Sequence, residues 1–181
     1  MKKTPQIRNQ KNQKGLTLIE LMVGIVAISV LVFMVLAGYQ RFQVRSNVKT
    51  HVQDLIELST GVEDAFMKVE SSYANVTQAN VVNAKLVPAT MLRANVPYNP
   101  WGGAVDFVPN TINNANDAFD IVSPNIPDDA CVRLTERLAK TFRFVDVNGT
   151  VIRDLTTAPT ATNIQAGCNS PNNNTVTVTY Q

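Results

Sequence analysis

Residues 14–39 are KGLTLIELMVGIVAISVLVFMVLAGY, an apolar stretch with a single acid, Glu20, near its start. The twenty residues from Leu21 to Gln40 carry no charge. As a helix they would rise about 30 Å, which is the thickness of the hydrocarbon core of a bilayer. The pattern therefore predicts a membrane-spanning helix within residues 16–40.

Basic side chains are concentrated ahead of this stretch. The first fifteen residues contain no acid and five cations, Lys2, Lys3, Arg8, Lys11 and Lys14. Without them the net charge would change from +2 to −3, with 11 basic and 14 acidic residues left. Basic residues that precede a membrane-spanning helix stay in the cytoplasm, so we expect the rest of the chain to be exported. The acidic balance of that remainder argues against direct binding of nucleic acid.

Three other structures could contain such an apolar stretch. A buried core helix would have a polar face, whereas here only Ser29 and the ends of the stretch are polar. A secretory signal peptide could be cut after Val35, Leu36 and Ala37, but its apolar region is usually only about 7 to 15 residues long. The third is a signal anchor that is not processed at all. None of the three accounts for Glu20.

Beyond this stretch the apolar residues recur at helical spacing. They are Val48, Val52, Leu55, Val62, Phe66 and Val69, with Ser59 at the missing step. No proline occurs from Leu16 to Val87, so one helix over residues 16–72 is allowed, with residues 41–72 as its amphipathic half. Three cations share one side, which indicates a solvated face or charge complementarity between neighbouring copies: Arg41, Arg45 and Lys49.

The remaining residues, 73–181, predict a globular head in which the long helix packs on an antiparallel sheet of four or five strands. The fold class is therefore α+β. Asn148 and Gly149 predict the two-residue turn of a hairpin. The other expected elements are strands at 104–108, 118–122 and 175–180, the last of them at an edge or closing the sheet, and a helix at 127–140.

The segment of residues 73–100 is rich in Asn, Val and Pro and lacks a clear period. It predicts a long connecting loop with a short helix near residues 88–94. Trp101 follows directly, and we expect it to anchor the core rather than to bind a ligand.

Two cysteines, Cys131 and Cys168, lie in the C-terminal half. In an exported chain an even pair most simply forms one disulfide, and two separate thiols are the alternative. A bond between them would close a loop of about 38 residues and contribute about 3 to 4 kcal/mol in the chain-entropy model.

Nothing in the sequence points to catalysis. The single histidine, His51, falls in a helical stretch, where we expect a surface or inter-subunit position. His51, Cys131 and Cys168 lack the spacing of a zinc site, and neither a nucleophile elbow nor a glycine-rich phosphate loop occurs. We therefore expect no enzyme, no metal and no cofactor.

The residues around Glu20 resemble the N-terminal module of the type IV pilins. The basic leader ends in Lys14 and Gly15, and GLTLIEL then leads into the uncharged run. The resemblance implies that a prepilin peptidase cuts after Gly15, that the new N-terminal Leu16 is N-methylated, and that Glu20 guides assembly. It implies a membrane-bound precursor, a helical homopolymer as the product, and the assembly platform and ATPase of the inner membrane as partners.

Further features resemble the type IVb pilins of the thin-pilus kind. They are the 15-residue leader, Leu16 as the first mature residue, NPWGG at residues 99–103, and IPDDAC ahead of the later Cys168. The resemblance implies the pilin fold, a C-terminal region bounded by a Cys131–Cys168 disulfide, and outward-facing loops at residues 156–174. It also implies a major pilin of a cell-surface pilus for adhesion, aggregation or conjugative contact.

One residue departs from the pattern, because pilins with shorter leaders commonly have a proline at about the place of Ala37. The same machinery also uses minor pilins and the pseudopilins of type II secretion, which stay as alternatives. A signal-anchored periplasmic binding domain that never polymerises is an alternative of a different class. It would need neither Gly15 nor Glu20.

Overall fold

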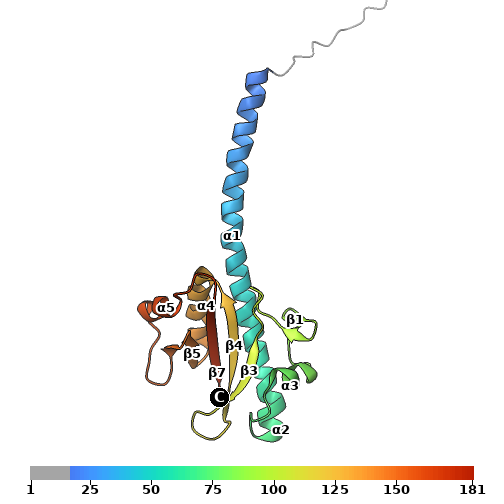
Figure 1. The fold of residues 1–181 in the computed structure, drawn as a ribbon, viewed down its shortest axis with the longest axis vertical. Helices are drawn as coiled ribbons and strands as arrows, with labels where there is room; N and C mark the ends of the chain where they lie inside the picture. The colour runs from blue at the N-terminus through green and yellow to red at the C-terminus, as the bar shows by residue number, and fades with distance from the viewer. Residues whose placement is uncertain (1–16) are drawn as a thin grey trace, which may run out of the picture. The chain divides into compact units, whose positions relative to one another are not determined.

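The computed structural model describes the backbone of residues 17–181 and all of their side chains except those of residues 36–38 and 40. The expected leader, with Gly15 and Leu16, lies outside the described residues. The chain divides into two compact units, residues 1–41 and residues 42–181. Figure 1 shows the helices and strands of the chain in order.

A long helix begins the described chain. α1 extends over Leu18–Val62 and continues into a π-helical turn, η1 Glu63–Met67, and a last turn, α2 Lys68–Glu70. Ser71 follows in the left-handed conformation, with φ 56°. The described part thus confirms the expected helix up to two residues before its expected end at residue 72.

The π-helical turn changes which residues are buried. A π-turn holds one residue more than an α-turn, so the residues after it are rotated about the helix axis. Val62 and Phe66 are buried as expected, whereas Val69 is 76% exposed. The expectation for Val69 is wrong because it assumed a constant period of 3.6 residues.

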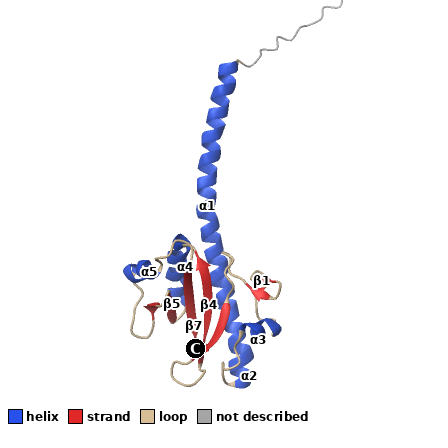
Figure 2. Cartoon of the chain, in the orientation of Figure 1, coloured by secondary structure: helices blue, strands red, loops and turns tan. Residues whose placement is uncertain are grey.

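The second unit is built on a five-stranded antiparallel sheet, which confirms the expected α+β class (Figure 2). The strand order is β3-β4-β7-β5-β6, and all neighbouring pairs are antiparallel. The strands are β3 Asp106–Asn110, β4 Ala118–Ile126, β5 Phe144–Val147, β6 Thr150–Arg153 and β7 Asn174–Tyr180. A separate two-stranded sheet consists of β1 Leu92–Arg93 and β2 Val96–Pro97.

Two strand predictions need correction. The strand expected at 104–108 is β3, which starts two residues later, because Ala104 forms an isolated bridge with Tyr98. The strand at 175–180 was expected at an edge or closing the sheet; it is not an edge strand, since β7 pairs with β4 on one side and with β5 on the other. Alternating valines and threonines show that one face is buried, but they do not distinguish a central strand from an edge strand.

Helices cover one face of this sheet. In β7, Val176 and Val178 are buried, whereas Thr177 and Thr179 on the other face are partly exposed. The buried face meets α1 and α4 Asp128–Thr141, which matches the helix expected at 127–140 within one residue. The helical residues of this core include Val48, Val52, Leu55, Leu58 and Val62 from α1 and Ala130, Cys131, Leu134, Leu138 and Ala139 from α4.

The hairpin of β5 and β6 has the expected turn. Val147 pairs with Thr150, and the two residues between them have positive φ, 52° for Asn148 and 80° for Gly149. This is the conformation in which a type I′ turn joins two twisted strands, and it favours an Asn-Gly pair.

Two short helices were not expected from the sequence. They are α3 Gln78–Asn83 and α5 Ala161–Gly167, and each begins after a threonine whose hydroxyl accepts a backbone hydrogen bond. Thr77 caps α3 and Thr160 caps α5 in this way. The helix expected near residues 88–94 is wrong, because that segment holds a turn and β1.

The NPWGG loop is fastened to β4 through one asparagine. Asn99 Oδ1 accepts hydrogen bonds from the backbone N–H groups of Trp101 and Gly103, at 3.0 and 2.9 Å. Its Nδ2 donates to the carbonyl of Pro124 in β4 at 2.5 Å. Trp101 is partly buried and packs against the core, as expected.

Gly103 leaves no room for a side chain in this loop. A Cβ there would clash with the Pro124 carbonyl and lie 2.8 Å from Asn99 Nδ2. We expect Gly103→Ala to lower the free energy of unfolding by about 2 to 3 kcal/mol, because backbone must move and the Asn99 contacts are lost. The measurement is denaturant unfolding in detergent, followed by the fluorescence of Trp101, the only tryptophan.

Gly102 supplies the matched control. Its φ is +84°, but a Cβ there meets no atom within 4 Å, and asparagine tolerates this conformation. Gly102→Asn should cost less than about 1 kcal/mol. Equal losses in the two variants would contradict the steric explanation.

Candidate assembly site

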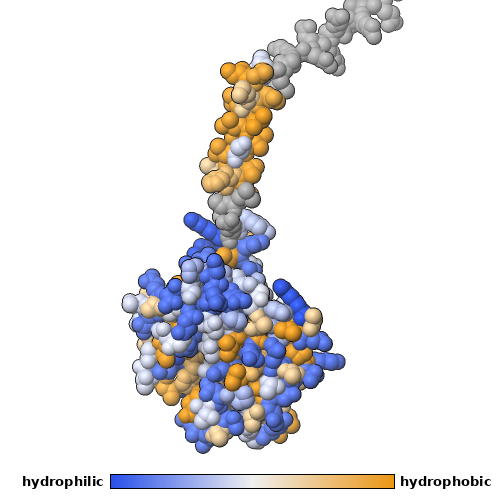
Figure 3. Space-filling model, in the orientation of Figure 1, coloured by the Kyte–Doolittle hydropathy of each residue, from blue (hydrophilic) through white to orange (hydrophobic). Residues whose placement is uncertain are grey.

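The first part of α1, Leu18–Val35, is a continuous apolar surface. By length and composition this segment can cross a membrane, and no part of it is buried by the rest of the chain. Leu18 and Phe33, near its two ends, are 78% and 75% exposed. Figure 3 shows it as an almost unbroken apolar surface. Apolar surface of this extent requires lipid or other protein around it.

Glu20 is the acid of this segment and lies in the first turn of α1. The Thr17 hydroxyl accepts a hydrogen bond from the Glu20 backbone N–H at 3.3 Å, and the Thr17 carbonyl accepts from Glu20 and Leu21. Thr17 thus caps the helix. The Glu20 side chain is exposed, and its carboxylate has no hydrogen-bond or ion-pair partner among residues 17–181. A carboxylate in the first turn of a helix is favoured by the helix dipole and can form an ion pair with a cation.

The hydroxyl group of Ser29 does not interrupt the apolar surface. Ser29 Oγ donates to the carbonyl oxygen of Ile25, one turn earlier, at 2.7 Å. Because this bond satisfies the hydroxyl inside the helix, Ser29 can face lipid or another helix without an unpaired donor.

In the second unit, three acidic or imidazole side chains on the long helix make polar contacts with the head. The pairs are His51 with Ser123 of β4 at 3.1 Å, Asp54 with Thr90 at 2.9 Å, and Glu63 with Tyr180 of β7 at 2.6 Å. The partners are separated by 72, 36 and 117 residues, so no local sequence signal could have found them.

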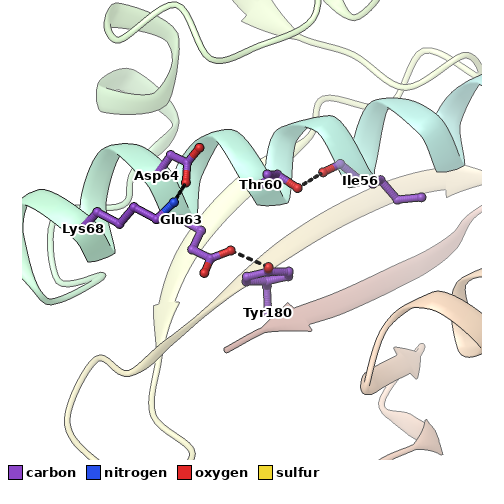
Figure 4. Close-up of polar contacts among 6 residues, drawn as sticks. All are labelled: Ile56, Thr60, Glu63, Asp64, Lys68 and Tyr180. Carbon is purple, nitrogen blue, oxygen red and sulfur yellow. Dashed lines mark hydrogen bonds and ion pairs between the residues drawn. The ribbon is translucent and has the colours of Figure 1, made fainter.

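The Glu63–Tyr180 bond ties the end of the helix to the end of β7 (Figure 4). The Tyr180 hydroxyl donates to the carboxylate, and this bond, together with desolvation, raises the pKa of Tyr180 to about 12. The hydroxyl therefore stays a donor at any physiological pH. One turn further on, Lys68 forms an exposed ion pair with Asp64, which contributes little to stability.

His51 is buried inside the head, which corrects the expectation of a surface or inter-subunit position. It is 0% exposed, and its ring lies edge-on to Trp101 with centroids 5.8 Å apart. Nδ1 has no hydrogen-bond partner among the described residues, and burial lowers the pKa of the imidazole to about 4. A sequence signal was present, because His51 lies three residues after Val48 and four before Leu55, on the apolar stripe.

Cys131 and Cys168 form the expected disulfide, with Cα atoms 5.8 Å apart. Cys131 is in α4 and Cys168 is the C-cap of α5, so the bond joins two helices. It fixes α5 to the core in addition to the buried side chain of Ile164. In the described part of the chain, no group of three His, Cys, Asp or Glu side chains could hold a metal ion.

Comparisons with known proteins agree with this arrangement. A family model described as "PilS N terminal" matches residues 45–181, and one described as "Prokaryotic N-terminal methylation motif" matches residues 10–36. The type IV major fimbrial protein FimA of Dichelobacter nodosus is 27% identical over 96 residues, which are 51% of this chain. The match spans 60% of the length of that relative.

Two solved structures share the fold. The type IV pilin TcpA of Vibrio cholerae El Tor matches with a TM-score of 0.57 and 17% identity, covering 75% of this chain and 99% of TcpA. The type IVb pilin of Salmonella typhi matches with a TM-score of 0.58 and 18% identity, covering 72% of this chain and 97% of that one.

The buried imidazole of His51 predicts a loss of stability in mild acid. Its pKa is lowered from 6.5 to about 4 on folding, so the unfolded chain takes up a proton that the folded chain refuses. The contribution of the neutral imidazole to the free energy of unfolding is present above pH 6.5, and it is lost as the pH decreases toward 4. Between pH 7 and pH 5 the loss should be about 2 kcal/mol. It is measured by denaturant unfolding in detergent at both pH values.

His51→Gln and Asp54→Asn separate this effect from other groups. Burial raises the pKa of Asp54, so that carboxyl group works in the opposite direction and favours the folded state as the pH falls. The loss between pH 7 and pH 5 should disappear in His51→Gln and persist or grow in Asp54→Asn. An equal loss in wild type and His51→Gln would exclude the imidazole as the cause.

Proposed function

Because this chain belongs to the PilS family of type IV pilins, we propose that it is the major subunit of a type IVb pilus, made as a prepilin and polymerised through α1. Members of this family are structural subunits, not enzymes. The observation that carries the proposal is the fully exposed apolar surface of Leu18–Val35 with one carboxylate, Glu20, at its start. A helix with this surface can reside in lipid and can also pack against copies of itself.

The proposed processing follows the methylation motif that matches residues 10–36. Prepilin peptidase would remove residues 1–15 by cutting after Gly15, and Leu16 would become the N-methylated first residue. Residues 16–40 would then be the membrane and polymerisation helix, residues 41–72 its amphipathic half, and residues 73–181 the head.

Charge gives Glu20 its role. An α-amine has a reference pKa of about 7.7 to 8.0, so the new terminus at Leu16 would be cationic beside an apolar helix. When subunits leave the lipid, that cation and Glu20 must be paired, because one unpaired buried charge costs about 3 to 5 kcal/mol. A properly docked pair gains little net energy, since desolvation offsets most of the attraction. We therefore propose that Glu20 pairs with the terminus of a neighbouring subunit and sets the stagger between subunits.

The remaining parts of the proposal concern place and partners. The precursor would reside in the bacterial inner membrane, where the assembly platform and its ATPase move it into a cell-surface pilus. The disulfide-bonded head favours a pilin over a pseudopilin of type II secretion. The segment of residues 156–174, which includes α5, would face outward. Adhesion, aggregation and conjugative contact are the roles that such a surface can serve.

Mass spectrometry of the mature protein tests the processing. We expect a chain that begins at Leu16 with one methyl group on its α-nitrogen. Deletion of the prepilin peptidase should leave Met1 in place, which is the control. A wild-type chain with Met1 uncut, or with a cut after Ala37, would contradict the proposal.

Glu20→Ala tests the pairing. Insertion and cleavage should be normal, but the yield of fibres should fall at least about tenfold in cells without wild-type subunits, because an unpaired terminus must be buried. The measurement is sheared pilus protein relative to total protein. Glu57→Ala is the matched control, since Glu57 is an exposed acid of the same helix. Normal fibre yield from Glu20→Ala would overturn the pairing.

A further inference from the structure

A pocket of about 300 Å³ lies between α1 and α4 in the second unit. Its lining consists of Arg45, Val48, Arg133, Glu136 and Arg137. Val48 is 1% exposed and belongs to the core, whereas the four charged residues are exposed. The pocket is thus an apolar floor surrounded by three guanidinium groups and one carboxylate.

The arginines of the pocket carry charge that the protein does not neutralise. Within the described residues Arg45, Arg133 and Arg137 form no ion pair, not even with Glu136 beside them. Arg133 and Arg137 are four residues apart on α4, where like charges repel. The pocket therefore has a net charge of about +2 and gains from an anion that reaches more than one guanidinium.

The three guanidinium groups of the pocket favour phosphate over other anions. A guanidinium group presents a planar fork of donors that matches the oxygens of phosphate, and it is more weakly hydrated than an ammonium group. Three of them around an apolar floor suit a phosphate that is attached to an apolar body. A phospholipid headgroup has this composition.

The position in the chain supports a lipid rather than a free ion. Arg45 comes five residues after the uncharged run ends at Gln40, which is about 7 Å of helix. The headgroup region on each side of a bilayer is about 5 to 8 Å thick. Chain length alone therefore keeps Arg45 close to the phosphates of the outer leaflet when residues 16–40 span the membrane.

We infer that the pocket of Arg45, Arg133 and Arg137 binds the phosphate of an anionic phospholipid while the subunit resides in the membrane. This rests on the proposed membrane residence of the precursor. The bound lipid holds α4 at the membrane surface before assembly. It must be released when the subunit enters the filament, so the site acts only in the pool of unassembled subunits.

Native mass spectrometry of the full mature chain in neutral detergent micelles tests the inference. The micelles contain either phosphatidylglycerol or phosphatidylcholine. Wild type should retain one phosphatidylglycerol about tenfold more tightly than phosphatidylcholine, and Arg133→Ala/Arg137→Ala should lose that preference. Lys140→Ala/Arg143→Ala removes the same charge from the last turn of α4 and the residue after its C-cap, outside the pocket, and should keep the preference. Both pairs are exposed, so circular dichroism should show an unchanged fold.

Each other outcome overturns the inference. Equal losses in the two double variants would mean that only net charge attracts the lipid. Displacement by millimolar inorganic phosphate, without preference between the two lipids, would assign the pocket to free phosphate. A dimer that depends on Arg133 and Arg137 but excludes lipid would assign it to a second copy of the chain. Normal membrane insertion in any of these cases would leave the pilin proposal intact.

Discussion

The head depends on the need to cover one apolar face of a five-stranded antiparallel sheet. The helix stripe from Val48 to Val62 and the buried side of α4 together provide that cover. Each fully buried valine or leucine contributes about 1.5 to 3 kcal/mol, so this contact dominates the energy of the unit. The polar contacts of His51, Asp54 and Glu63 contribute less energy, but they fix the helix to β4, to the turn before β1 and to β7. The disulfide and the NPWGG loop then secure peripheral segments to the same core.

One helix carries two hydrophobic patterns, and each serves a different environment. Up to Val35 the apolar residues surround the helix, and none of this segment is buried. From Val48 onward they form a stripe, and the stripe is buried. Arg45 stands where one pattern gives way to the other. In the proposed move from lipid to polymer, the surroundings of the first segment change while the stripe stays packed in the head.

The sequence was informative where local chemistry decides structure. The helix, the Asn148–Gly149 turn, α4 and the disulfide all follow from spacing, turn chemistry or cysteine pairing. At the proposed assembly site, Glu20 could be identified from the sequence because a core helix, a signal peptide or a signal anchor would not require a carboxylate in the apolar run. The methylation-motif model matches residues 10–36, a segment that includes Glu20.

Other features depend on long-range contacts that no window of sequence contains. The strand at 118–122 extends past Pro124 to Ile126, because a register shift removes the need for a regular ladder there. The arginine pocket brings together Arg45 of α1 and, about ninety residues later, Arg133 and Arg137 of α4, so it emerges only in the fold. The central position of β7 restricts the order in which the strands of the sheet can join. The β3–β4 and β5–β6 hairpins can each form early, but they share no hydrogen bonds until β7, later in the chain than either, inserts between them. The two hairpins can therefore join into one sheet only once residues 174–180 are free to pair with both of them.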